Sequence, residues 1–133
     1  MATSAQYAAT PAIGAALLTT ADTSLTAPST VGTVITAGSN GTRVDYIEVM
    51  GVATTTASLI NLFLYDGSTY HLWQQVPVYA ITTGTTTPSY QATLSSNGNA
   101  NVMPLCLPSG WSLRATTTVT QTGVKVIAYG GDF

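Results

Sequence analysis

The stretch SLINLFLYDGSTYHLWQQVPV, residues 58–78, decides the fold class of this chain. Residues 58–65 are apolar almost throughout, and an apolar run of this length bounded by turn residues is typical of a buried β-strand. Asp66-Gly67-Ser68 follows and supplies a tight turn of the kind that joins antiparallel strands. Residues 69–78 then alternate from side to side, so the whole stretch predicts a β-hairpin.

The second strand of this hairpin, residues 69–78, has two predicted faces. Pro77 interrupts the hydrogen-bond ladder, which places the strand at the edge of a sheet or ends its pairing early. By simple alternation, the two faces consist of Tyr70, Leu72, Gln74, Val76 and Val78 on one side, and of His71, Trp73, Gln75 and Tyr79 on the other.

Outside the hairpin, short runs of β-branched and aromatic residues alternate with turn residues along most of the chain. Such spacing is typical of an all-β sandwich or barrel, and no apolar residues recur at helical spacing over three turns. The sequence therefore predicts an all-β fold, a two-sheet sandwich of about eight strands that is jelly-roll-like. The further strands are expected at residues 31–37, 43–52, 89–94, 101–107, 111–119 and 124–129.

The turn at residues 39–42 contains the Asn-Gly pair that tight hairpins favour, so we expect residues 31–37 and 43–52 to pair with each other. The phase of the second of these strands is ambiguous.

Within residues 43–52, Val44 and Tyr46 fit one face of a strand, whereas Ile47 and Val49 fit the other. Either both faces of this strand are covered, or a bulge shifts the phase between the two pairs.

Residues 1–30 differ from the rest of the chain. They are rich in Ala, Thr and Ser, contain two prolines, and have one apolar stretch, which ends at Leu18. Such a segment has too little apolar surface to hold itself in place. We therefore predict an extended N-terminal arm over residues 1–30, with one edge strand around 15–20, and a β-sandwich domain over residues 31–133 that does not need most of the arm.

Charge is scarce: 6% of the residues are charged and the formal net charge is −2, whereas about a quarter of an ordinary soluble domain is charged. Threonine-rich segments such as 81–87 supply the missing polarity, and a hydroxyl is cheaper to desolvate than a charge. The surface is therefore predicted to be covered by other protein, as in an assembly subunit.

The chain has only three basic residues, Arg43, Arg114 and Lys125, which are too few to bind nucleic acid through its phosphates. No apolar run reaches the ~20 residues of a membrane helix, so no membrane partner is expected.

Few groups are available for catalysis, because His71, Cys106 and Glu48 are each the only residue of their type. His71 is expected on a strand face, since no second His completes a metal site. Asp45 and Glu48 are three apart on a strand and point to opposite faces unless a bulge intervenes. Cys106 lies in an apolar run and is expected as a small buried hydrophobe, with a reactive thiol as the alternative. We predict no catalytic residue, no metal site and no cofactor.

Four aromatic residues with polar tips are the only candidates for a binding site. Such side chains anchor protein interfaces or stack on sugar rings, and they also fill sandwich cores. We favour core or subunit interface over a sugar platform for this group, which consists of Tyr70, Trp73, Tyr79 and Trp111.

Several phrases of the chain together resemble a group of small structural proteins encoded by tailed bacteriophages and prophages. They cover most of the chain, and each is a turn-and-strand phrase with little chemistry in it. The phrases are ATP at 9–11, GSNGTR at 38–43, LFLYDG at 62–67, LWQQ at 72–75, LPSGWSLRAT at 107–116 and QTGVKVIAYGGDF at 121–133.

The resemblance implies a virion component with a β-sandwich fold and no enzyme activity, made in the cytoplasm of the host bacterium. Within that group we expect a capsid decoration (cement) protein, which binds the outside of the head and bridges capsid subunits. Its expected partners are the major capsid protein and copies of itself, as a trimer or other homo-oligomer. The alternatives are a tail, neck or fibre component and, from a different class, a carbohydrate-binding module for host attachment.

Overall fold

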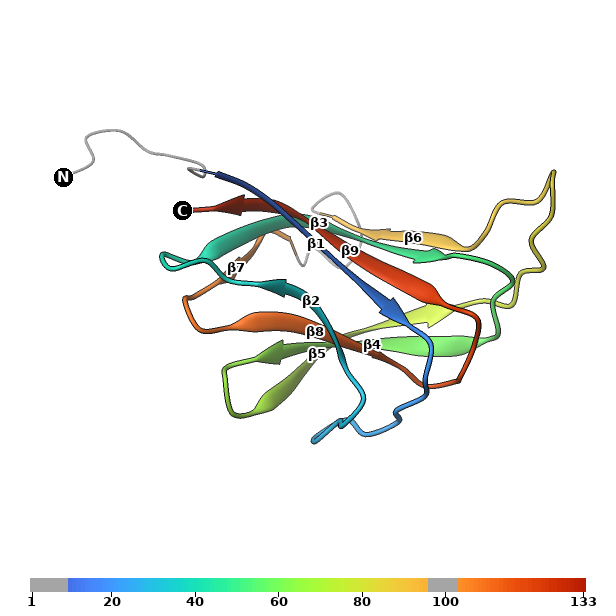
Figure 1. The fold of residues 1–133 in the computed structure, drawn as a ribbon, viewed down its shortest axis with the longest axis horizontal. Coiled ribbons are helices and arrows are strands. Elements are labelled where there is room, and N and C mark those ends of the chain that lie inside the picture. The colour runs from blue at the N-terminus through green and yellow to red at the C-terminus, as the bar shows by residue number, and fades with distance from the viewer. Residues whose placement is uncertain (1–9, 96–102) are drawn as a thin grey trace.

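The computed structural model describes residues 10–95 and 103–133, and this part of the chain consists of nine β-strands without a helix. The strands form two antiparallel sheets that lie one above the other (Figure 1), which confirms the predicted all-β sandwich. The first two residues of the strand expected at 101–107 lie outside the described residues. In chain order the strands are β1 (Thr10–Leu18), β2 (Gly32–Thr36), β3 (Thr42–Gly51), β4 (Ser58–Tyr65), β5 (Tyr70–Val78), β6 (Gln91–Leu94), β7 (Leu105–Leu107), β8 (Ser112–Thr117) and β9 (Val124–Asp132).

The strand order identifies the topology. Sheet A has the order β1-β9-β3-β6, with β7 also paired to β3, and sheet B has the order β2-β8-β4-β5. The pairings are nested: β4 pairs with β5, β3 with β6 and β7, β2 with β8, and β1 with β9. A long antiparallel hairpin that rolls up into two sheets in this way is a jelly roll, as the sequence predicted.

The core lies between the two sheets and is made of the side chains that alternate inward along each strand. It is almost entirely aliphatic, because β-branched and leucine side chains pack well on a pleated surface. Its fully buried members include Ile47, Val49, Val124 and Val126 from sheet A, and Ile60, Leu62 and Leu113 from sheet B.

The turn between β2 and β3 forms as predicted, but the two strands do not pair. Gly41 has φ +94, and its N–H donates to the carbonyl of Gly38 at 3.0 Å. However, β2 pairs with β8 in sheet B, and β3 lies in sheet A. The predicted hairpin of residues 31–37 and 43–52 is therefore wrong, because a tight turn fixes a local chain reversal and not the partner of each strand.

A bulge resolves the ambiguous phase of β3. The register between β3 and β9 shifts between Val44 and Tyr46, which leaves Asp45 as the extra residue. Val44 and Ile47 are consequently both buried in the core, although they are three residues apart. The bulge that the sequence left as one of two alternatives is thus confirmed.

The hairpin of residues 58–78 forms as β4 and β5, and β5 is an edge strand of sheet B, as Pro77 predicted. A second register shift follows Leu62, so the simple alternation predicted for β5 is wrong over its first half. Val76 points into the core, whereas Leu72 lies opposite Phe63 on the outer side of the sheet. The bulge separates the two phases, because one extra residue moves every following side chain to the other face.

The strand expected within the N-terminal arm is longer and more integral than the sequence suggested. β1 pairs with β9 over its whole length, from Thr10 opposite Asp132 to Leu18 opposite Val124, and Ala16 and Leu18 belong to the core. The sandwich therefore includes residues from Thr10 onward, and the boundary expected at residue 30 does not separate it from an arm. Residues 1–9 of the expected arm lie outside the described part of the chain.

Candidate interaction surfaces

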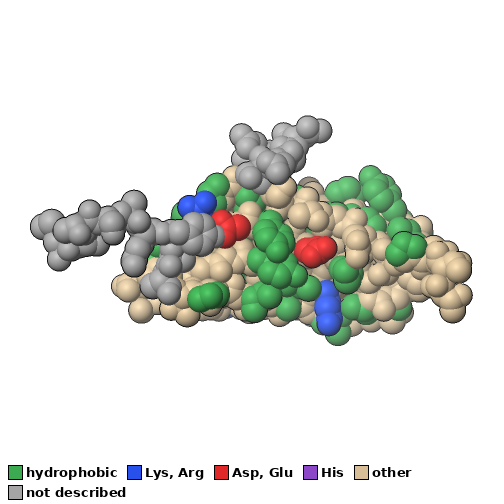
Figure 2. Space-filling model, turned by 90° about the horizontal axis from the view of Figure 1, so that it is seen from above, with side chains coloured by type: hydrophobic (Ala, Val, Ile, Leu, Met, Phe, Trp, Pro, Cys, Tyr) green, Lys and Arg blue, Asp and Glu red, His purple; other side chains and the backbone are tan. Residues whose placement is uncertain are grey.

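The outer side of sheet A carries a largely apolar surface, because alternate residues of its long strands point away from the core. Figure 2 shows apolar side chains in a band across this side of the molecule, with acidic and basic side chains beside them. We call this surface the sheet A face, and its members are Pro11, Ile13, Ala15 and Leu17 of β1, Lys125, Ile127 and Tyr129 of β9, and Tyr46, Glu48 and Met50 of β3.

Two side chains of the sheet A face are unusually accessible for their size: Ile13 is 68% exposed and Leu17 is 53% exposed. Beside Ile13, the rings of Tyr46 and Tyr129 stack with centroids 4.4 Å apart. Desolvation raises the pKa of Tyr129, and the nearby Glu48 carboxylate raises this pKa further. A shallow depression of about 360 Å³ opens between Ile13 and Tyr129. A contiguous exposed apolar surface of this kind is a candidate contact site.

Charge on this side of the molecule is balanced. Arg43 and Asp45 form an ion pair at 3.1 Å next to the bulge of β3. Glu48 and Lys125 lie within the apolar band, at diagonal positions of β3 and β9, and neither forms an ion pair with another described residue. Four of the eight charged residues of the chain therefore gather on one side, with no net charge among them.

At one end of the sandwich, three loops contain no charged residue, and we call these loops, residues 52–57, 79–90 and 118–123, the threonine-rich end. The loop between β1 and β2 lies beside them and carries one charged residue, Asp22, whose N–H donates to the carbonyl of Thr117. Backbone hydrogen bonds between Thr55 and Ile81 tie the first loop to the second, and the side chain of Gln121 accepts from the N–H of Thr56. Most of its threonines are exposed, as is Tyr79 at 65%. This end presents hydroxyl and methyl groups on a hydrogen-bonded frame.

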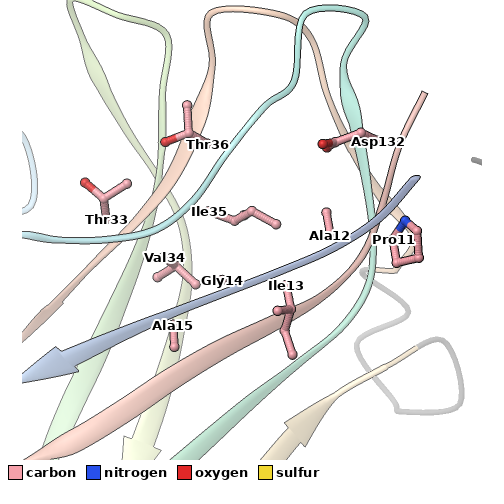
Figure 3. A pocket seen from close by; sticks show the side chains of 10 residues that line it. All are labelled: Pro11, Ala12, Ile13, Gly14, Ala15, Thr33, Val34, Ile35, Thr36 and Asp132. Atoms are coloured by element: carbon pink, nitrogen blue, oxygen red, sulfur yellow. The ribbon is translucent and has the colours of Figure 1, made fainter. Parts of the chain in front are cut away.

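A groove of about 640 Å³ separates the edge strands β1 and β2, which lie close together without pairing (Figure 3). Gly14 and Val34 both line it, and a Cβ atom added at Gly14 would lie 2.0 Å from the carbonyl oxygen of Val34. Asp132 lies at one end, and its carboxylate accepts a hydrogen bond from the buried hydroxyl of Thr42. The groove therefore lies between two strand edges that already approach to backbone contact.

The outer side of sheet B holds a compact aromatic cluster around Arg114. The guanidinium carbon lies 4.0 Å from the centroid of the Tyr65 ring, and Nη1 donates to the Tyr70 hydroxyl at 3.0 Å. Phe63 is fully buried beneath Tyr70, edge to face with its ring. Arg114 thus has its charge satisfied by a π face and hydroxyl groups, which is a cation–π arrangement.

The four aromatic residues singled out in the sequence do not share one contact. Tyr70 belongs to the cluster on sheet B, and Trp73 packs against the core. Trp111 stacks on His71 with centroids 6.0 Å apart, and Tyr79 meets Tyr90 edge to face at 6.1 Å. The Ile13 and Tyr129 surface had no part in the sequence prediction, although the alternation of β1 and β9 could have revealed it.

His71 is bound into the turn of the β4–β5 hairpin. Its Nε2 lies 3.0 Å from Oδ2 of Asp66, whose other oxygen accepts from the N–H groups of Ser68 and Thr69. The hydrogen bond from Thr69 is the main cause of a pKa of Asp66 well below its ordinary value of 3.8, and His71 contributes next. These contacts give both side chains a role in fixing the turn.

Cys106 is exposed, so its prediction as a buried hydrophobe is wrong. β7 is a three-residue edge strand, and alternation places Leu105 and Leu107 toward the core and the thiol outward. An apolar run does not reveal which of its members faces solvent when only one side of the strand is covered.

The described residues offer no candidate metal site, and comparison with known proteins identifies no relative. Among residues 10–95 and 103–133, no three His, Cys, Asp or Glu side chains cluster as metal ligands, and no helix long and apolar enough to cross a membrane occurs. Neither a known family nor a characterised protein matches this sequence.

Proposed function

We propose that the protein is a non-enzymatic bacteriophage structural protein that decorates the capsid and binds the outside of the head through its threonine-rich end. The observation that carries this proposal is the complete absence of charge from the three loops of that end. Hydroxyl and methyl groups lose water at modest cost and find hydrogen-bond partners on another protein surface. The jelly roll also occurs in viral capsid and lectin domains.

Repetition makes such a contact effective. A capsid offers many equivalent sites, so a contact that is weak for one copy becomes stable when neighbouring copies are linked. The hydrogen bonds that tie the loops to one another reduce the ordering cost of binding, since the end needs little rearrangement.

Binding of the purified protein to heads that lack it tests the proposal directly. A carboxylate placed at the exposed Thr86 of the threonine-rich end should abolish binding, because a charge without a partner would be desolvated. The matched control is Ser109→Asp, which adds the same charge to an exposed turn at the opposite end of β8. Equal binding by Thr86→Asp and wild type would contradict the proposed contact.

Copy number and position in the particle distinguish decoration from the other virion roles. A cryo-EM map of the particle should place the protein on the head in many copies. A position restricted to the neck, tail or fibres would replace decoration by those alternatives, and retention on a glycan array would favour host attachment.

A further inference from the structure

We infer that the sheet A face is the contact surface between two copies of this chain, related by a twofold axis that passes through the centre of the contact. This inference does not depend on the capsid proposal, because it concerns the free protein. It starts from the exposure of Ile13 and Leu17, whose apolar side chains point away from the core on the edge strand β1.

The positions of Glu48 and Lys125, which form no ion pair with another described residue, favour a second copy of the chain as the partner. In the register of β3 and β9, Glu48 lies opposite Ile127 and Met50 lies opposite Lys125, so the two charges sit at diagonal corners and the apolar Met50 and Ile127 at the other two. A twofold axis that lies in the plane of the contact, along the diagonal from Met50 to Ile127, exchanges the positions of Glu48 and Lys125. Glu48 of one copy then faces Lys125 of the second copy, and the same contact is made twice.

A different partner would need to reproduce this charge pattern. An unrelated apolar surface would desolvate both Glu48 and Lys125 and offer neither of them an opposite charge, which is costly. A surface of one sign would attract one of them and repel the other. A second copy supplies both opposite charges by symmetry, and neither residue has an ion pair within the described chain that it must give up.

The dimensions of the face set the expected strength. β1, β9 and β3 are nine or ten residues long. With a rise of about 3.4 Å per residue and about 4.8 Å between strands, the face measures about 30 Å by 15 Å. The contact is therefore smaller than the about 800 Å² that each partner contributes to a standard interface. We therefore expect a weak dimer, as for other small contacts, and take a dissociation constant in the micromolar range as the working value.

Charge reversal tests the pairing without disturbing the core. Sedimentation of the wild type from about 1 to about 100 µM should show a monomer–dimer equilibrium. Glu48→Lys and Lys125→Glu should each weaken dimerisation at least about tenfold, because each creates two like-charge contacts. An equimolar mixture of the two variants should dimerise as the wild type does, since both lysines of the first variant then face glutamates of the second.

Ile13→Asp tests the apolar part of the contact and should give a monomer. Leu25→Asp is its matched control, because Leu25 is also exposed, at 44%, but lies in the loop between β1 and β2. Thermal melts establish that each variant is folded.

Three results would overturn the inference. They are a wild type that remains monomeric up to about 100 µM, an oligomer of another size, and a mixture of charge-reversed variants that dimerises no better than either variant alone. A monomeric wild type whose binding to capsids is lost in Ile13→Asp would assign the face to the capsid instead.

Discussion

At the residue scale, two glycines allow backbones to approach more closely than any other residue would. A Cβ atom at Gly14 would lie 2.0 Å from the carbonyl oxygen of Val34, and one at Gly130 would lie 1.8 Å from the carbonyl oxygen of Arg43. The first contact brings the edges of the two sheets together, and the second lies beside the bulge of β3. Both sites therefore depend on the missing side chain rather than on a special backbone angle.

Alanine substitution at Gly14 and Gly130 tests how closely the neighbouring backbones approach. Gly14→Ala and Gly130→Ala should each lower the free energy of unfolding by about 3 kcal/mol, since the neighbouring atom is backbone and can yield only by moving a strand. Gly84→Ala is the matched control, because no atom lies within 4 Å of its added Cβ, and it should be neutral or stabilising by up to about 1 kcal/mol. Urea unfolding gives all three values. Wild-type stability in Gly130→Ala would show that β9 and β3 lie further apart than described.

Two aspartates with lowered pKa values, Asp66 and Asp22, predict how the stability of the fold changes in acid. The pKa of Asp66 is lowered by the Thr69 N–H, then by His71 and the Ser68 N–H, and the pKa of Asp22 is lowered chiefly by the N–H groups of Thr30 and Ser24. Because these pKa values are depressed in the folded state, their stabilisation is present above the ordinary value of 3.8 and is lost as the pH falls below it.

Melting temperatures measured from about pH 6 to about pH 2 should therefore fall most steeply below the ordinary aspartate pKa. Asp66→Asn should melt below the wild type at neutral pH and approach it at the acid end, since a protonated carboxyl and an amide accept hydrogen bonds equally poorly. Parallel curves for the two proteins would show that Asp66 does not contribute through its charge.

At the element scale, β1 determines where the sandwich begins. Its pairing with β9 satisfies one side of the strand along its whole length, and Ala16 and Leu18 close the core at this edge. Without β1, strand β9 would become an exposed edge with part of the core uncovered, which favours aggregation.

Truncation distinguishes this strand from a dispensable arm. Removing residues 1–18 should cost most of the about 5–15 kcal/mol that stabilises a domain of this kind, with loss of a cooperative thermal melt. Removing residues 1–9 alone leaves every described pair of β1 in place and should retain the melt. Circular dichroism of the two truncated proteins measures both, and a cooperative melt after loss of residues 1–18 would restore the boundary expected at residue 30.

The elements differ in how far their sequence predicts them. The hairpin of β4 and β5 was predictable because its turn, its apolar run and Pro77 all act locally. The partners of β2 and β3 were not, since they are chosen by strands far along the chain. Alternation along β1 and β9 could have revealed which of their side chains face outward, but not that Ile13 and Tyr46 lie together, because the two meet only through their pairing with β9.

At the scale of the whole molecule, the distribution of charge predicts how attachment to a particle responds to salt. The threonine-rich end has no charged residue, and the screening length falls from about 30 Å at 0.01 M to about 3 Å at 1 M salt. Apolar burial and uncharged hydrogen bonds are not screened in this way. If the proposed contact is correct, binding should therefore change little over that range.

Particles washed across the salt series should keep the protein, as measured by gel densitometry against the major capsid band. Stepwise release below about 0.3 M salt, where screening acts on exposed pairs, would instead assign the contact to the few charged residues. The dimer inferred for the sheet A face should behave differently and weaken with salt, because Glu48 and Lys125 contribute to it.

The nested pairing of the jelly roll also has a consequence for how the chain is made. Thr10 pairs with Asp132, so β1 leaves the ribosome long before its partner strand exists. At about 5–20 residues per second, the nascent chain waits on the order of ten seconds for β9. The inner hairpin of β4 and β5 can form during that time, whereas the outer layers must assemble after synthesis is nearly complete. A fold of such high contact order is expected to close slowly, in milliseconds to seconds, and a chain cut short before β9 has no route to the native state.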